Sequence, residues 1–382
     1  MLEDKLLGFI DELWPEIWST ARYIYDNPEL GGKEYKAVSC LKRVLEKYNF
    51  NYTSPYLNLD TAFRAQIGYG KPVICLLAEY DALPDIGHAC GHHLIAGAAI
   101  GAAVALASLE EYWSGTLVVL GTPAEETIGA KVHLVDNGAF SNIDVALMFH
   151  PGQSAIIDIS SQALEALEVT FTGFIGHSSQ GDNKNPLISL INLFQQIFSY
   201  RRIHYPLRQI DGVITYGGIT PNLIPEKAIG RFYLRSKTIE LLEDTISDFR
   251  EMALRSASLV DTKVEIERFE PRYLPMKTNG KLAEVFKKKA KMSGVKINDY
   301  YQYIIGSMDM GNVSQVVPAI HPFLPLGRGM FSAHSPEFKN IAGSIAGEKT
   351  MKQATKSLAL TTLELFLKPN LVTEIWQEHF IK

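Results

Sequence analysis

The stretch that decides the fold is Val73-Ile-Cys-Leu-Leu77, which continues through Ala78-Glu-Tyr-Asp-Ala-Leu-Pro84 to Gly87-His-Ala-Cys-Gly-His-His93. Its first five residues form an apolar run, which is typical of a strand buried in a parallel sheet. A thiol, imidazoles and carboxylates follow directly, at the end of the strand where α/β proteins place their chemistry. Cys90 and His92 are ligand types that suit zinc or a similar borderline metal. The stretch therefore predicts an α/β protein with a metal site beside this strand.

The composition sets the size and class of the protein. A chain of 382 residues is too long for one ordinary core, so two domains are expected. Hydrophobic residues make up 46%, charged residues 21%, and the formal net charge is -5. Because this balance is mildly acidic and no basic block dominates, we expect no nucleic-acid partner and no anionic membrane partner.

The cysteines and the longest apolar run bear on location. Cys40, Cys75 and Cys90 are too few for a disulfide framework, which favours a reducing compartment and hence the cytoplasm. The N-terminus lacks the pattern of a signal peptide. The run over residues 94–109 is rich in alanine and glycine and shorter than the roughly 20 residues of a membrane span, so we expect a buried helix there.

The order of the remaining patterns predicts an α/β domain with a mostly parallel sheet and helices on both faces. Strands and helices alternate over the first part of the chain. The expected strands are 73–77, 116–121 and 145–150, and the expected helices between them are 94–109 and 130–137.

The pattern then changes to that of a smaller α+β domain. We expect a strand at 163–173, a helix at 186–198, strands at 212–218 and 228–235, a helix at 239–254 and a strand at 263–268. This order is that of a ferredoxin-like domain. Residues 163–272 are therefore expected to be inserted into a catalytic domain made of 1–162 and 273–382.

Three further groups follow strand-like runs. Glu125 and Glu126 are adjacent carboxylates, His150 ends an apolar run, and His334 lies in a loop of small residues. Taken alone, the Glu pair fits a polar helix cap, and each histidine fits a structural role. Together with Cys90 and His92, they supply five ligands of suitable type, which is more than one tetrahedral zinc takes and fits two neighbouring ions.

The motifs in their order resemble one known family. They are Ala78-Glu-Tyr-Asp-Ala-Leu-Pro84, Gly87-His-Ala-Cys-Gly-His92, Pro123-Ala-Glu-Glu126, His150-Pro-Gly152, Asn222-Leu-Ile-Pro225, Gly306-Ser-Met-Asp-Met-Gly311 and Ala333-His-Ser-Pro-Glu337. The chain resembles the aminoacylase/glutamate-carboxypeptidase family of di-metal peptidases. Within that family it is similar to the amidohydrolase branch of hippurate hydrolase, auxin-conjugate hydrolases and aminobenzoyl-glutamate hydrolase. The motifs span nearly the whole chain.

The resemblance implies a role for each matching residue. The metal ligands would be Cys90, His92, Glu126, His150 and His334. Glu125 would be the general base, and Asp81 an acid that orients a neighbouring ligand. His177, in the inserted lid or dimerisation domain, would reach the partner subunit's site and stabilise the oxyanion, and Asn222 would contact the substrate.

Three positions leave alternatives open. Arg235 ends an expected strand, where it would bind a substrate carboxylate or be an ordinary strand-end charge. His93 stands where this branch usually carries Asp or Asn. It would be a further ligand or, as we expect, would support the structure or a ligand. Glu79 stands where many relatives carry a metal-binding histidine, and we expect it to support a ligand or pair with a cation rather than bind metal.

The function implied is metal-dependent hydrolysis of amide or peptide bonds in N-acyl amino acids, dipeptides or aminobenzoyl-glutamate-like conjugates. Two divalent ions are expected, with zinc favoured and manganese or cobalt as alternatives, and the protein is expected to form a homodimer. Two other functions stay open. One is a non-catalytic protein that uses the cleft to hold a ligand, and the other is a cysteine hydrolase based on Cys90.

Overall fold

The computed structural model describes residues 1–180, 184–297, 302–303, 306–327 and 331–381, and these form two compact units. Unit 1 contains residues up to Ser160 and most of the chain after Met276. Unit 2 begins at Ser161 and ends at Pro275, with a short later stretch that ends at Met308.

Unit 1 is a mixed α/β structure built on one main sheet. Its strands are β1 (Asn51–Thr53), β2 (Phe63–Tyr69), β3 (Val73–Glu79), β4 (Gly115–Thr122), β5 (Val145–Leu147), β6 (His150–Gly152), β7 (Ile159–Ser160), β14 (Gln302–Tyr303), β15 (Ala319–Ile320) and β16 (Phe323–Pro325). The main sheet has the order β1-β2-β4-β3-β5-β15. Strand β3 runs parallel to β4 and β5, and β5 runs parallel to β15, whereas β1 and β2 are antiparallel. The mostly parallel central sheet is thereby confirmed.

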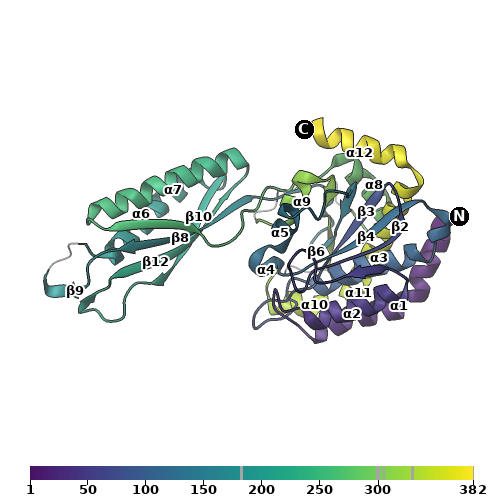
Figure 1. The fold of residues 1–382 in the computed structure, drawn as a ribbon, viewed down its shortest axis with the longest axis horizontal. Coiled ribbons are helices and arrows are strands. Elements are labelled where there is room, and N and C mark those ends of the chain that lie inside the picture. The colour runs from purple at the N-terminus through teal and green to yellow at the C-terminus, as the bar shows by residue number, and fades with distance from the viewer. Residues whose placement is uncertain (181–183, 298–301, 304–305, 328–330, 382) are drawn as a thin grey trace. The chain divides into compact units, whose positions relative to one another are not determined.

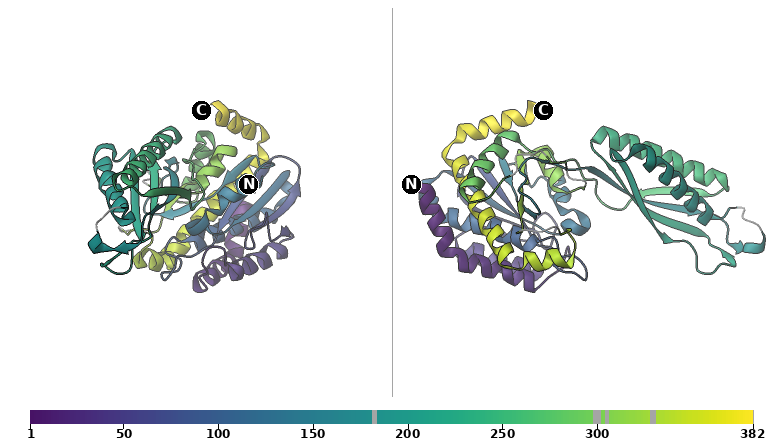
Figure 2. Two further views of the ribbon diagram at one scale, coloured as in Figure 1. Left: turned by 60° about the vertical axis from the view of Figure 1, so that its left-hand side comes forward. Right: turned by 180° about the vertical axis from the view of Figure 1, so that it is seen from behind.

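The helices of unit 1 pack around this sheet in layers (Figure 1): α11 packs against α1, α3 and α8, with α3 against β3, and α5 packs against α9. They are α1 (Leu2–Asp26), α2 (Tyr35–Lys47), α3 (His92–Ala107), α4 (Glu125–Ile128), α5 (Ala130–Asp136), α8 (Gly280–Met292), α9 (Met310–Val316), α10 (Pro336–Ala342), α11 (Ile345–Leu367) and α12 (Pro369–Ile381), with a 3-10 turn η1 (Glu110–Tyr112). Figure 2 shows the same layers from two further directions.

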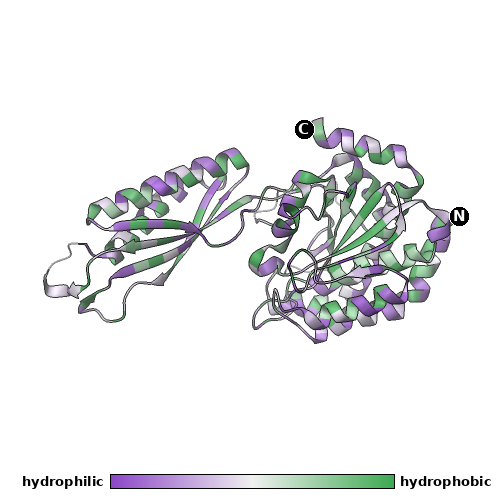
Figure 3. Cartoon of the chain, in the orientation of Figure 1, coloured by the Kyte–Doolittle hydropathy of each residue, from purple (hydrophilic) through white to green (hydrophobic). Residues whose placement is uncertain are grey.

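Helix α3 is buried along almost its whole length, as its alanine and glycine content predicts. It packs against α1, α11 and β3. A Cβ at Gly97 would lie 2.5 Å from Sδ of Met351, and one at Gly101 would lie 2.8 Å from a methyl of Ile17. The small residues therefore let three helices approach one another closely. Figure 3 shows the apolar colouring of the central strands of the sheet on which α3 packs.

Among the expected boundaries that were wrong, two lie beside the polar motifs. Helix α3 begins at His92 rather than at 94, because Gly91 takes a left-handed conformation and starts the helix there. The expected strand 145–150 ends at Leu147, and His150 instead begins the separate strand β6, which pairs in parallel with β16. The apolar run continues across this break, so hydrophobicity alone does not reveal it.

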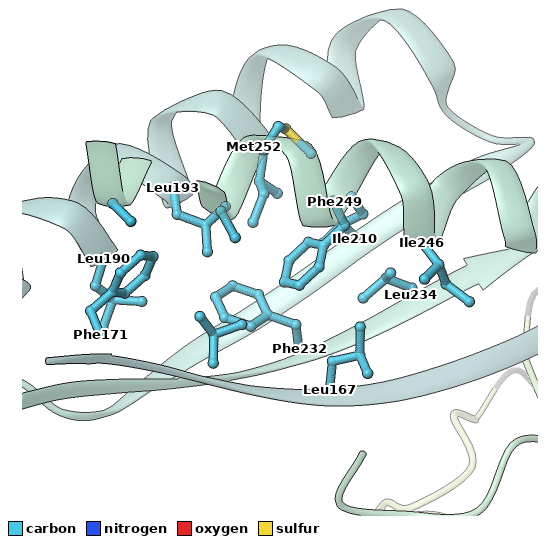
Figure 4. Packing of buried hydrophobic residues seen from close by; sticks show 14 of the residues in the cluster. Leu167, Phe171, Leu190, Leu193, Ile210, Phe232, Leu234, Ile246, Phe249 and Met252 are labelled. Atoms are coloured by element: carbon cyan, nitrogen blue, oxygen red, sulfur yellow. The ribbon is translucent and has the colours of Figure 1, made fainter. Parts of the chain in front are cut away.

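Unit 2 has a four-stranded antiparallel sheet in the order β10-β12-β8-β13, with two long helices. Its elements are β8 (Ala163–Thr172), β9 (Gly176–His177), η2 (Ser178–Gln180), α6 (Pro186–His204), β10 (Arg208–Tyr216), β11 (Leu223–Ile224), β12 (Lys227–Ser236), α7 (Ile239–Leu259) and β13 (Lys263–Arg268). The order along the chain is strand–helix–strand–strand–helix–strand. Apolar residues of α6 and α7 pack on one face of the sheet, around Phe232 and Phe249 (Figure 4).

Among the helices that the structure describes, none combines the length and the apolar character needed to cross a membrane.

Candidate metal centre

The polar side chains of the sequence motifs gather where the central strands of unit 1 end. Glu79 is the last residue of β3, and Asp81 lies two residues beyond it. Glu125 and Glu126 follow β4, and His150 follows β5. Because these strands are neighbours and run in parallel, their carboxyl ends bring the side chains to one edge of the sheet.

Gly91 lets Cys90 and His92 enter this edge side by side. Its φ of +79° lies in the left-handed region that favours glycine, and a Cβ there would lie 2.7 Å from Cγ of Pro151. Any side chain at position 91 would therefore strain the backbone and displace the residue that follows His150.

The Glu125-Glu126 pair is presented by a strained turn. Ala124, the residue before it, has a φ of +56°, which is uncommon for a residue with a side chain. Its backbone N–H donates to Oε1 of Glu34 at 2.8 Å, and the other oxygen of Glu34 accepts from Thr61 at 2.6 Å. The buried Glu34 carboxylate thus holds the turn that aims both glutamates.

His334 also has a left-handed backbone conformation, with a φ of +62°, and its backbone N–H donates to the carbonyl oxygen of Ala89 at 3.1 Å.

Five of the sequence-predicted side chains form two ligand groups that share one thiol. Cys90, His92 and His150 make the first group, and Cys90, Glu126 and His334 make the second, with the ligand atoms of each group within 4.8 Å of one another. Sγ of Cys90 lies 3.5 Å from Nε2 of His150. Nε2 of His334 lies 3.1 Å from Oε1 of Glu126. Two ligands of one zinc ion lie about 3 to 3.6 Å apart, so these spacings fit.

Hydrogen bonds fix the orientation of two imidazoles. Nδ1 of His92 lies 2.9 Å from Oδ1 of Asp81, and Nδ1 of His150 lies 2.7 Å from the carbonyl oxygen of Pro151. Each Nδ1 therefore donates a proton to an oxygen, which leaves Nε2 as the nitrogen that would bind an ion. Burial lowers the pKa of His92, but the carboxylates of Glu79 and Asp81 raise it well above its usual value, so a bound ion would replace the proton on Nε2. Oδ2 of Asp81 also accepts the backbone N–H of Glu126 at 3.0 Å, so one carboxylate positions a residue of each group.

Two buried atoms of the site suggest that a cation belongs there. Nε2 of His92 and Oε1 of Glu126 are buried and make no hydrogen bond of normal geometry. Buried polar atoms in proteins are nearly always satisfied, so atoms of ligand type that lack a hydrogen bond are expected at a metal site. The thiol, imidazole and carboxylate donors match zinc and similar divalent ions.

The local electrostatics agree with metal ligation rather than thiol catalysis. Burial raises the pKa of the Cys90 thiol, so this residue lacks the thiolate that a cysteine nucleophile needs. Burial and the neighbouring His92 lower the pKa of His150 to about 4, which keeps this imidazole neutral and able to ligate. A bound cation would favour the thiolate form of Cys90.

Glu125 has the electrostatic setting of a proton carrier. Burial, together with the carboxylates of Glu79 and Asp309, raises the pKa of Glu125 well above its usual value. A carboxyl group with a raised pKa holds and releases a proton more readily near neutral pH.

Sequence reasoning missed a buried ionic network behind the first ligand group. Nζ of Lys131 contacts Oε2 of Glu79 and lies 2.8 Å from Oδ1 of Asp309, and Lys131 is fully buried. The expectation that Glu79 pairs with a cation is thereby confirmed. Asp309 lies inside a quoted motif, but a lone lysine in a short helix carries no signal of burial. His321 is also buried near this network, with its ring 5.5 Å from that of His150.

His93 faces away from the ligand groups. Its Nε2 lies 3.3 Å from the carbonyl oxygen of Ala342, and its ring lies 4.8 Å from that of Tyr25. Burial lowers the pKa of His93 well below its usual value, so the ring is neutral. These contacts favour a role in packing α3 against the end of α10.

The three remaining candidates belong to unit 2. His177 lies in β9, where it pairs with Leu223, and Asn222 stands just before β11. Arg235, in β12, lies 3.3 Å from a carboxylate oxygen of Asp211. They are not members of the ligand groups in unit 1.

This site has the two features that a metal-dependent hydrolase needs. It offers paired groups of metal ligands around a shared thiol, and a carboxyl group of raised pKa lies beside them.

Comparison with known proteins supports this assignment. Residues 75–362 match Peptidase family M20/M25/M40. The chain is 32% identical to the Xaa-Arg dipeptidase of Mus musculus over 398 residues, which covers 99% of this chain and 92% of that protein. It is 26% identical to one of the p-aminobenzoyl-glutamate hydrolase chains of Escherichia coli (strain K12), covering 94% and 91%.

A solved structure has the same fold. It is a dinuclear metal-binding peptidase of the M20 family from Bacillus subtilis, with a TM-score of 0.70 and 18% identity, covering 93% of this chain and 99% of that one. The chain belongs to Peptidase family M20/M25/M40. It is a hydrolase of amide or peptide bonds in small substrates, and the expected resemblance and enzyme class are confirmed.

The Asp81 contacts lead to the first prediction. Replacing Asp81 with Asn leaves the size unchanged but removes the charge that orients His92, so we expect metal affinity to fall by roughly 10- to 100-fold. Titration with zinc against a competing chelator measures this loss. Asp144→Asn is the matched control, because Asp144 binds Lys71 and Val73 instead of a ligand. Equal affinities for Asp81→Asn and the natural protein would contradict the role given to Asp81.

Proposed function

We propose that this protein is a two-metal dipeptidase or aminoacylase, and that Cys90, His92, Glu126, His150 and His334 would hold its two ions. The observation that carries the proposal is the pair of ligand groups around Cys90 with Glu125 beside them. The candidate substrates are dipeptides, N-acyl amino acids and aminobenzoyl-glutamate-like conjugates. Dipeptides with a C-terminal arginine come first, because the relative at 32% identity is named for that cleavage.

The reaction adds water across the amide bond and releases a carboxylate and an amine. Two divalent ions, when bound, acidify water and polarise the carbonyl group. Glu125 takes a proton from the attacking water at its carboxylate and later gives it to the leaving amine nitrogen. The raised pKa of Glu125 supports both steps, since the same group must first accept and then donate.

Zinc is the proposed metal. A thiolate and imidazoles favour zinc over harder ions, whereas manganese or cobalt would suit the carboxylate ligands.

His177 is proposed to stabilise the oxyanion. Its Nδ1 accepts the backbone N–H of Ser179 at 3.2 Å, so the proton of the neutral ring lies on Nε2. His177 is exposed, so Nε2–H is available as a donor to a developing negative charge. Asn222 is proposed to contact the substrate beside it, since the carbonyl oxygen of Asn222 accepts from Ser178.

Arg235 is proposed to bind the substrate carboxylate. Its guanidinium lies beside the ring of Tyr233 and at 3.3 Å from Asp211, which orients the group while leaving other N–H donors for a second carboxylate.

We propose that unit 2, with the strand order of a ferredoxin-like domain, forms a homodimer. Strand β10 is an edge of the sheet, and its Val213 is 58% exposed. Phe198 on the adjacent helix α6 is 68% exposed, so edge and helix offer one apolar surface. The three cysteines are free, which supports the cytoplasm as its location.

The first test of the proposed function measures hydrolysis and metal content together. We expect the zinc-loaded protein to release amine from a panel of dipeptides, N-acyl amino acids and aminobenzoyl-glutamate. We expect a chelator to abolish release and added zinc to restore it. Bound metal without turnover on any of these substrates would favour the ligand-binding alternative, and turnover that survives chelation would favour a cysteine hydrolase.

Glu125→Gln tests the proton carrier. We expect turnover to fall by about 10² to 10⁴-fold while the metal content stays that of the natural protein, because the amide cannot accept the proton. Glu110→Gln is the control, since Glu110 is exposed in the 3-10 turn η1. If Glu125→Gln turns over substrate nearly as fast as the natural protein, Glu125 is not the proton carrier.

Val213→Lys tests the dimer. A charge on the exposed edge strand should prevent association, and sedimentation velocity should then report a monomer. We also expect turnover to fall, because His177 is proposed to act in the partner subunit's site. Phe174→Lys, in the exposed segment after β8, should leave the natural assembly unchanged. An active monomer would contradict the role given to His177 across subunits.

A further inference from the structure

The two oxygens of the Glu79 carboxylate have different neighbours. Oε2 contacts Nζ of Lys131, whereas Oε1 lies 3.0 Å from Nε2 of His92. The side chain is 2% exposed, so water does not satisfy it. One oxygen is thus held by a buried cation, and the other faces the ligand atom of the first group.

Oε1 of Glu79 faces the ring nitrogen of His92 that is left to bind an ion. Nδ1 of His92 lies 2.9 Å from Oδ1 of Asp81, so Nε2 is the nitrogen that faces Glu79. An ion held by Nε2 would lie next to Oε1 as well, because the two atoms are only 3.0 Å apart. A similar spacing, 3.1 Å, separates the paired ligands His334 and Glu126 of the second group.

Lys131 is placed to fix the direction of this carboxylate. It is fully buried in α5, and Asp309 binds both its Nζ at 2.8 Å and its backbone N–H at 3.1 Å. The lysine is therefore held from two sides and has little freedom to move away from Glu79. With Oε2 held in this way, Oε1 keeps pointing toward Nε2 of His92.

We propose that Oε1 of Glu79 is a further ligand of the ion bound by Cys90, His92 and His150, and that Lys131 is the positioning residue for Glu79. The proposal rests on the proposed two-metal function, and it revises the sequence-based expectation that Glu79 does not bind metal. The first position then has four protein ligands, while the second, with Cys90, Glu126 and His334, has three.

This asymmetry gives the two ions different tasks. A position closed by four protein ligands holds its ion as part of the structure, whereas a position with three ligands keeps room for water or substrate. The burial agrees, because His92 is buried in the first group and His334 is half exposed in the second. The first ion should therefore bind more tightly and exchange more slowly than the second.

Glu79→Gln is the main test, because it keeps the size of the side chain and the Lys131–Asp309 pair. In chelator competition with zinc, we expect the natural protein to show one tight and one weaker ion. The variant should lose at least about tenfold in affinity for the tight ion alone, the range seen when a group that supports a metal site is removed. With one equivalent of cobalt, the visible spectrum should also change, because it reports the ligands of the first ion.

Lys131→Met tests the positioning role. We expect the affinity for the tightly bound ion to fall, even though the substitution removes a positive charge. The double variant Glu79→Gln/Lys131→Met should bind this ion no more weakly than Glu79→Gln alone. Glu364→Gln is the matched control, because Glu364 pairs with Lys289 on α8 and faces no metal ligand of either group. Circular dichroism checks folding, and Glu79→Gln decides the question if Lys131→Met does not fold.

The outcomes distinguish a failure of the proposed two-metal function from a failure of the roles given to Glu79 and Lys131. A natural protein that binds no divalent ion would overturn the proposed function itself. Two ions bound by Glu79→Gln with natural affinity, and an unchanged cobalt spectrum, would overturn only the ligand role of Glu79. A Lys131→Met variant that binds the tight ion as well as the natural protein would overturn the positioning role.

Discussion

The candidate metal centre depends on the buried carboxylate of Asp81. Oδ1 fixes His92, a candidate ligand of the first group, and Oδ2 holds the backbone of Glu126, a candidate ligand of the second. A buried carboxylate that accepts two hydrogen bonds has its polar atoms satisfied, so its position is well defined. Since Asp81 lies two residues beyond the end of β3, this central strand is the reference from which both groups are placed.

Much of this arrangement could be predicted from the sequence. The apolar runs predict the parallel strands, because buried strands need continuous hydrophobic residues, and the alanine-rich run predicts the buried helix α3. The polar motifs that follow these strands predict that the candidate ligands Cys90, His92 and Glu126 gather in one place, since strand ends meet at one edge. The break after Leu147 was not predictable, because the apolar run does not change where β5 ends and β6 begins.

The supporting network was harder to find. Lys131 lies in a short helix, where a lysine is ordinarily exposed, and only the fold shows that Glu79 and Asp309 surround it. Glu34 is likewise far from Ala124 in sequence, and its role in holding the turn before Glu125 depends on a contact between distant segments. Candidate ligands can be recognised in the sequence by their residue type and position. The residues that orient them are defined only by three-dimensional packing.

The glycine between Cys90 and His92 has a consequence for how this centre tolerates change. A Cβ at Gly91 would lie 2.7 Å from Cγ of Pro151, the neighbour of His150, so there is no room even for a methyl group at this position. The start of helix α3 and strand β6 therefore approach each other as closely as they do only because position 91 has no side chain. Alanine is the smallest possible replacement and already collides, so this position offers no gradual route of sequence change.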